Sequence, residues 1–238
     1  MKILGIECSA GPVSAAVCEN GEILSCVYAN IHLTHSQTLL PMITQALDDS
    51  KTALRDIGCI AAAAGPGSFT GIRIGISAVK GLAMPMEIPC AAVSTLRAMA
   101  EPFRGNSCIV CAVMDARCNQ VYNAMFEVRG NEIIRLCEDR ALMCDILAKE
   151  VEQYAENGSR PVVITGDGAS LFTAFTAGIK NVYPAAPQVR FQSAAGVCLA
   201  AEGIVNDGKT VTPDELLPVY LRLPQAEREL KRKQAERT

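Results

Sequence analysis

The chain has 238 residues, half of them hydrophobic and a fifth charged, with a formal net charge of −3. This composition is typical of a globular protein and excludes a disordered chain. The small acidic excess provides no overall basic field for holding nucleic acid, and no apolar run approaches the roughly 18 residues of a membrane helix. Eleven scattered cysteines, mostly in apolar segments, and an N-terminus that leads directly into a strand pattern predict a reduced, cytoplasmic protein.

The first half of the chain predicts a three-strand meander followed by alternating helices and strands. The turn residues Asn20-Gly21 separate two alternating segments and indicate a hairpin. A helix is expected over 36–49; Pro41 lies in its first turn if Thr38 is the N-cap, and otherwise it kinks the helix. Its apolar face is predicted to hold Leu39, Leu40, Ile43, Ala46 and Leu47. The other expected elements are strands at 2–9, 13–19, 22–29, 57–65 and 88–94 and helices at 69–84 and 95–103.

The second half repeats this pattern. It predicts strand-like segments at 108–117, 120–128, 132–142, 161–170 and 182–187 and helices at 145–158, 171–178 and 193–208. The Gly-containing strand ends "AAAAGPGS" and "VITGDGAS" lie about 100 residues apart, which favours duplication over two unrelated halves. We therefore expect lobes at 1–103 and 104–223, with the last helix packing back on the first lobe, and a charged tail at 224–238. The spacing of Cys108 and Cys111 places them on opposite faces of a strand, which suits neither zinc nor a redox pair.

A duplicated unit of this kind resembles the actin-like ATPase fold, an α/β fold in which each lobe has a mixed five-stranded sheet with flanking helices. Four motifs are similar to those of the TsaB family, formerly YeaZ: "ILGIECS", "HSQTLLPMI", "GPGSFTGIRIG" and "PVYLR". The resemblance implies a non-catalytic subunit needed to form threonylcarbamoyladenosine beside the anticodon of tRNAs reading ANN codons. It also implies a TsaD-like paralogue as partner, a TsaE-like ATPase in the same assembly, and ATP and metal used by those partners. We expect a homodimer when the chain is alone, and indirect or weak contact with tRNA.

The Gly-rich segment 61–81 has three explanations. Gly65, Gly67 and Ser68 precede a helix, as in phosphate-binding loops, but the Walker pattern is absent. Gly71, Gly75, Ala78 and Leu82 instead form a mostly small stripe that favours close packing, internal or with a partner, and turn geometry alone is the third explanation. With the resemblance, we expect a partner interface of His35, Ser36, Leu39, Leu40, Ile43, Leu47, Gly71, Ile72, Gly75, Ala78, Val79 and Leu82.

Several residues are candidate remnants of nucleotide-binding loops: Glu7, Ser9, Gly11, Gly65, Gly67, Ser68, Asp115, Gly166 and Gly168. Glu7 occupies the place of a metal-organising aspartate in ATP-using relatives, but the loop after it has no Lys or Arg, and Pro12 removes an N–H. For Asp115 and Asp167, strand-ending turn residues are the favoured interpretation.

Other chemistry is weakly indicated. His32 and His35 are the only histidines, and their spacing of three differs from the H-x-x-x-H metal pair of TsaD-like enzymes, so we predict no metal, no catalytic residue, and a capping or interface role for His35. A metallopeptidase would need a complete metal site. An ATP-dependent small-molecule kinase on the same fold is the alternative, and it would need phosphate ligands at Ala10-Gly11-Pro12.

Overall fold

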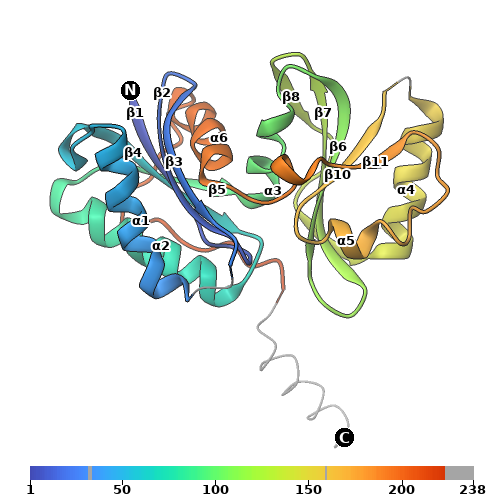
Figure 1. Ribbon diagram of the computed structural model, residues 1–238, viewed down its shortest axis with the longest axis horizontal. Coiled ribbons are helices and arrows are strands. Elements are labelled where there is room, and N and C mark those ends of the chain that lie inside the picture. The colour runs from blue at the N-terminus through green and yellow to red at the C-terminus, as the bar shows by residue number, and fades with distance from the viewer. Residues whose placement is uncertain (32–33, 159, 223–238) are drawn as a thin grey trace, which may run out of the picture.

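The computed structural model describes residues 1–31, 34–158 and 160–222, so the predicted tail at 224–238 lies outside the described residues. Two lobes stand side by side, each built on its own sheet (Figure 1). The first sheet has five strands in the order β3-β2-β1-β4-β5. They are β1 (Lys2–Glu7), β2 (Val13–Glu19), β3 (Glu22–Ala29), β4 (Ile57–Gly65) and β5 (Cys90–Ser94).

Helices cover both faces of the first sheet because its central strands are apolar throughout. On one face α1 (His35–Asp49) and α2 (Phe69–Ala83) pack side by side, and their apolar residues join the core around Leu4, Ile6 and Ile60. On the other face α6 (Ala194–Asn206) packs on β1 and β2, although it comes late in the chain, as its orange-red colour beside the blue strands shows (Figure 1). Short helical segments complete this lobe: η1 (Leu54–Asp56), η2 (Met84–Met86), α3 (Thr95–Ala98) and η3 (Glu101–Phe103).

The second sheet repeats the first in strand order and direction. β6 (Ser107–Asp115) pairs antiparallel with β7 (Gln120–Arg129) and parallel with β10 (Val162–Thr165), as β1 does with β2 and β4. The outer strands are β8 (Glu132–Arg135) and β11 (Val182–Pro184). The helical segments are α4 (Cys144–Asn157), α5 (Ala169–Phe172) and η4 (Pro187–Val189). The matching topology supports duplication, and the lobe boundary near residue 103 stays a proposal.

Two details of the second sheet test sequence expectations. The segment 132–142, expected as one strand, holds two, because β9 (Arg140–Met143) pairs separately with the other end of β7 and makes this sheet six-stranded. Cys108 and Cys111 lie in the cores on opposite faces of β6, as the period of two predicts.

The helix α1 spans nearly the predicted residues, but its N-cap is not the one that would place Pro41 in the first turn. The helix begins at His35, with Thr34 in the N-cap position, so Pro41 lies inside it rather than in its first turn, and Thr38 is not the N-cap. A proline there leaves the carbonyl one turn earlier without its helical donor. Leu39, Ile43 and Ala46 are buried as expected, but the face is rotated: Leu40 is 52% exposed.

The end of the described chain returns to the first lobe. We call residues 211–222 the C-terminal strap. Val211 forms an isolated bridge with Cys90 at the edge of the first sheet, and Leu216 is buried in the core beneath α2. Further along, the Val219 N–H donates to the Ala64 carbonyl at 2.7 Å, and the Tyr220 ring stacks on Phe69 at 4.5 Å. The strap thus reaches the junction of β4 and α2.

Candidate functional site

The ends of β1, β4, β6 and β10 converge between the lobes and form a cleft of about 450 Å³. Ser9, Gly11, Gly67, Ser68 and Asp115, all predicted as remnants of nucleotide loops, line it together with Asp167. Gly65, Gly166 and Gly168 are not among its lining residues, and Glu7 is fully buried at the end of β1, two residues before Ser9. The structure therefore brings five of these residues to one cleft, and their assignment to nucleotide loops stays a prediction.

The glycines of the Gly-rich segment make room for the chain itself. A Cβ at Gly65 would collide with the Val219 carbonyl of the strap, and one at Gly67 would lie 2.8 Å from Ser9 Cβ. A Cβ at Gly71 would collide with the Cys8 carbonyl. Both Gly65 and Gly67 also have positive φ, of 131° and 157°. Close approach of backbones therefore accounts for the unusual composition of "GPGSFTG".

Several backbone donors of these loops are bonded within the chain. The Ser68 N–H donates to the Ser9 carbonyl at 2.7 Å, and the Ser68 hydroxyl caps α2 by accepting from the Gly71 N–H at 3.3 Å. In the second lobe the Gly168 N–H donates to the Val113 carbonyl at 3.2 Å. The Asp115 carboxylate accepts from the Arg117 N–H at 2.7 Å, which is the turn role predicted for it. These contacts favour a structural role for the loops over a phosphate cradle.

Buried carboxyl groups dominate the electrostatics of the cleft. Burial raises the pKa of Glu7 from 4.5 to about 7, although its Oε1 accepts from the Ser9 N–H at 2.5 Å, and the charge of Asp167 raises it further. Burial likewise raises the pKa of Asp167, whose Oδ1 accepts from Gln192 Nε2 at 2.5 Å. Among the described residues, Glu7 Oε2, Ser9 Oγ and Gln192 Oε1 are buried without a hydrogen-bond partner.

The predicted partner interface divides into two sets. Six of its residues are buried in the first lobe and cannot touch a partner while the lobe is folded, so assigning them to the interface was wrong: Leu39, Ile43, Gly71, Ile72, Gly75 and Val79. The small stripe of α2 faces β1, because a Cβ at Gly75 would lie 3.7 Å from atoms of Ile6 and Cys8. The other six are exposed or partly exposed on α1 and α2: His35, Ser36, Leu40, Leu47, Ala78 and Leu82.

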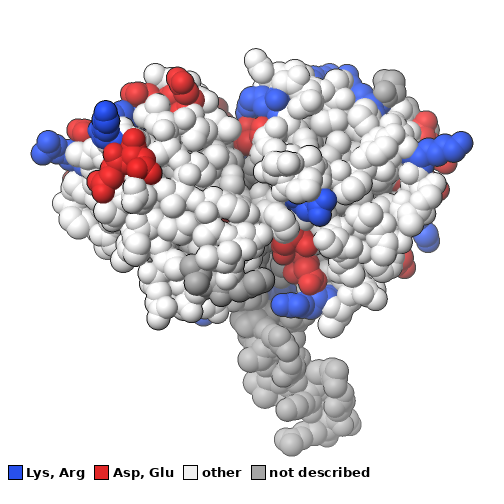
Figure 2. Space-filling model, in the orientation of Figure 1, with Lys and Arg blue, Asp and Glu red and all other residues white. Residues whose placement is uncertain are grey.

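The outer face of α1 is unusual for a surface helix. From His35 to Leu47 it carries no Asp, Glu, Lys or Arg, although Gln37, Leu40 and Thr44 are exposed. By contrast, α4 carries five charged residues: Asp145, Lys149, Glu150, Glu152 and Glu156. The lower front of the first lobe shows almost no charged side chains, whereas charges gather on its upper part (Figure 2). The exposed charges on these helices are Asp48 and Asp49 at the end of α1 and Arg73 on α2. Nearby, Gly81 on α2 is exposed, and a Cβ there would meet nothing within 4 Å.

The histidines do not indicate metal chemistry. His35 Nε2 lies 3.2 Å from the Gly11 carbonyl, so it connects α1 to the turn after β1. His32, the other member of the predicted pair, lies outside the described residues. Within residues 1–31, 34–158 and 160–222 no group of three His, Cys, Asp or Glu side chains could hold a metal ion. The structure therefore supports an anchoring contact for His35.

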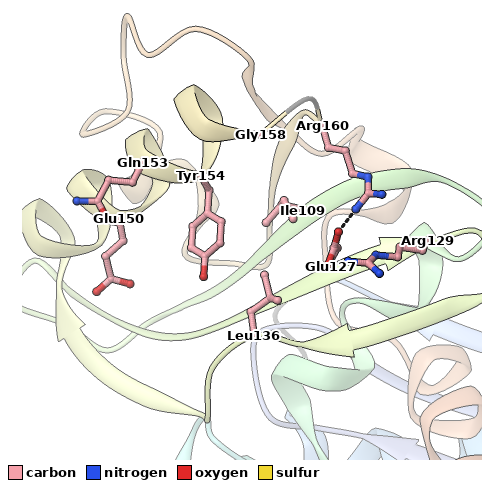
Figure 3. Close-up of a pocket in the computed structure, with 9 residues that line it drawn as sticks. All are labelled: Ile109, Glu127, Arg129, Leu136, Glu150, Gln153, Tyr154, Gly158 and Arg160. Carbon is pink, nitrogen blue, oxygen red and sulfur yellow. Dashed lines mark hydrogen bonds and ion pairs between the residues drawn. The ribbon is translucent and has the colours of Figure 1, made fainter.

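A second hollow, not anticipated from the sequence, lies between α4 and the second sheet and has a volume of about 700 Å³ (Figure 3). Tyr154 points into it between Glu150 at one end and the Arg160–Glu127 ion pair at the other. Glu127 also pairs with Arg129 at 2.7 Å, and Glu150 pairs with Arg140. Two guanidinium groups therefore share the Glu127 carboxylate, and the named ion pairs leave one positive charge in excess at the hollow.

Two lobes that repeat one strand order around a cleft define a protein of the actin-like ATPase fold class. A family model described as TsaD, tRNA N6-adenosine threonylcarbamoyltransferase, matches residues 23–210. The chain is 30% identical over 230 residues to the tRNA threonylcarbamoyladenosine biosynthesis protein TsaB of Bacillus subtilis, covering 95% of this chain and 96% of that protein. It is 33% identical to TsaB of Escherichia coli, covering 93% and 95%.

Solved structures agree with these relatives. YeaZ from Pseudomonas aeruginosa superposes with a TM-score of 0.78 at 27% sequence identity, covering 92% of this chain and 99% of that one. The chain therefore belongs to the TsaB (YeaZ) family, and its role lies in tRNA threonylcarbamoyladenosine biosynthesis. No helix of the described residues is long and apolar enough to cross a membrane.

Proposed function

We propose that the chain is a non-catalytic scaffold that activates a TsaD-like paralogue by forming a heterodimer with it. The outer face of α1 and α2 is the docking surface, and its contact residues include His35, Ser36, Leu40, Leu47, Ala78 and Leu82. The exposed glycine at position 81 belongs to the same surface and replaces Gly75 as the point of close helix approach. Assembly then holds the partner in its active arrangement.

The absence of charged side chains from His35 to Leu47 of α1 is the observation that carries this proposal. A solvent-exposed helix ordinarily presents charged residues to water, as α4 does. The cores of protein interfaces are depleted in charged side chains. A run from His35 to Leu47 without one charged residue, with Leu40 half exposed at its centre, fits a surface that is covered in the working assembly.

The proposal also covers self-association of the chain, the other subunits of the assembly, contact with tRNA and cellular location. The same surface would hold two copies together when no partner is present, since an uncovered apolar patch favours self-association. A TsaE-like ATPase joins through the partner complex, and ATP and metal are used by those subunits. Contact with tRNA is indirect or weak because the chain has a net charge of −3. A cytoplasmic location belongs to this proposal as well.

A pair of matched charge insertions tests the docking surface. Leu40→Glu places a carboxylate on the outer face of α1, whereas Ile146→Glu places one on α4, at a position that is also about half exposed. Sedimentation of each variant, alone and with the TsaD-like partner, gives the result. We expect Leu40→Glu to weaken both associations at least tenfold, equivalent to about 1.4 kcal/mol, and Ile146→Glu to match the parent chain. Equal effects of the two variants would reject this surface.

A further inference from the structure

We infer that the cleft between the lobes binds a small organic cation that carries a primary ammonium group. This inference does not depend on the proposed docking of a partner, because it concerns another face of the first lobe. It stands on three observations: the charges that line the cleft, the buried oxygen atoms that lack donors, and the backbone N–H groups that are already used.

Negative charge exceeds positive charge in the cleft. Two carboxylates, Asp115 and Asp167, and one guanidinium, Arg117, line it. The Arg117 side chain is 83% exposed and lies 3.7 Å from Asp115, so it neutralises that carboxylate from the solvent side. Among the described residues Asp167 forms no ion pair; its hydrogen bonds come from the neutral Gln192 amide and from backbone groups of Asp167 and Asp115. A second guanidinium, that of Arg222, donates to the Ala116 carbonyl at the edge of the cleft, so the carboxylates favour a cation mainly beside Asp167.

The second observation is an excess of acceptors. Ser9 lines the cleft, is 1% exposed, and has a hydroxyl without a partner among the described residues. Behind it, Glu7 is fully buried with its Oε2 also unpartnered, and Gln192 Oε1 is in the same state. Buried polar atoms are nearly always hydrogen-bonded, so a donor-rich group is expected here. An ammonium group supplies three donors and no acceptor.

The third observation separates an amine from a nucleotide. At the start of α2 the Ser68 N–H is bonded to the Ser9 carbonyl and the Gly71 N–H to the Ser68 hydroxyl, so two of the backbone donors that a phosphate could use there are taken. A cation needs none of these donors. The Tyr122 and Phe69 rings also line the cleft, and aromatic faces attract cations. A volume of about 450 Å³ suits a small ligand.

Isothermal titration of the full chain at pH 8 and constant ionic strength tests the inference, with putrescine and ethanolamine as cationic probes and Mg-ATP as the phosphate probe. We expect saturable binding of an amine and none of Mg-ATP. Asp167→Asn should weaken amine binding at least tenfold. Asp207→Asn is the control, because that carboxylate pairs with Lys209 on the surface beyond α6.

A second variant protects the test against misfolding. Asp115 is exposed at the end of β6, and Asn at this position can still accept from the Arg117 N–H, so Asp115→Asn should fold and weaken amine binding several-fold. The inference is overturned if neither amine binds by 10 mM, about 2.7 kcal/mol of binding free energy. It is also overturned if binding is unchanged in both cleft variants, or if Mg-ATP binds and competes with the amine.

Discussion

Gly71 in the first turn of α2 offers a direct measure of how the Gly-rich segment works. An added Cβ at this position would lie well under 3.0 Å from the Cys8 carbonyl oxygen, which is a backbone atom that no side-chain rotation can clear. Overpacking of this kind costs about 1–3 kcal/mol, and the rigid neighbour places Gly71→Ala at the upper end. The helix propensity of alanine returns at most about 1 kcal/mol.

The net effect of Gly71→Ala is therefore a loss of about 2 kcal/mol, which lowers the Tm by about 4–8 °C for a chain of this size. Two glycines of the same helix are matched controls. Gly75→Ala meets atoms of Ile6 and Cys8 at an ordinary 3.7 Å, and Gly81→Ala meets nothing within 4 Å. We expect Gly75→Ala to be neutral or better and Gly81→Ala to raise the Tm by about 2–4 °C.

Calorimetry of the dissociated chain and its three alanine variants decides this point. If Gly71→Ala were as stable as Gly81→Ala, the close contact between α2 and the turn after β1 would be wrong. Because Gly75 faces β1, a larger side chain such as leucine should lower the stability of the lone chain, and any loss of partner binding should follow from that instability.

Three further predictions concern stability. Burial raises the pKa of Glu7 from 4.5 to about 7, so the folded chain holds a proton here that it loses as the pH rises through 7. The free energy of unfolding in urea should therefore be about 3 kcal/mol higher for Glu7→Gln than for the parent at pH 8.5, and little different at pH 5. A difference that does not change with pH would refute this. Glu101 is buried between Arg97 and Arg104. Glu101→Gln should lower the free energy of unfolding by about 2–3 kcal/mol in the same assay, and no loss would show that these ion pairs do not stabilise the fold. Tyr220→Ala should cost about 1 kcal/mol through lost stacking on Phe69, and an unchanged Tm would contradict docking of the strap.

Local patterns predicted much of the fold because they depend on short-range physics. The turn at Asn20-Gly21 joins β2 and β3 as expected, with both residues at positive φ. Apolar periodicity located nearly every helix and strand, and the repeated Gly-containing strand ends indicated the matching sheets. The span of α1 was predicted to within one residue, but the sequence left the position of Pro41 open, and the structure shows it inside a helix that starts at His35.

The site was harder to predict because close approach depends on partners far away in the sequence. Spacing showed that Gly71 and Gly75 share a face of α2, but it could not show that this face meets Cys8 and Ile6. The strap is a similar case. The Val219 carbonyl leaves no room for a side chain at position 65, yet the two residues are 154 positions apart in the sequence. The charge-free run of α1 was present in the sequence, and comparing it with α4 would have identified the outer face.

The central claim is that the chain works by docking on a partner and contributes no chemistry. It is tested most directly by reconstituted threonylcarbamoyl transfer to tRNA, with the TsaD-like partner fixed and the chain titrated. Leu40→Glu should need at least tenfold more protein than Ile146→Glu and still reach the full rate at saturation. Asp115→Asn should follow the parent curve throughout. A saturated rate that collapses in Asp115→Asn, or a Leu40→Glu curve that coincides with the parent, would contradict the account.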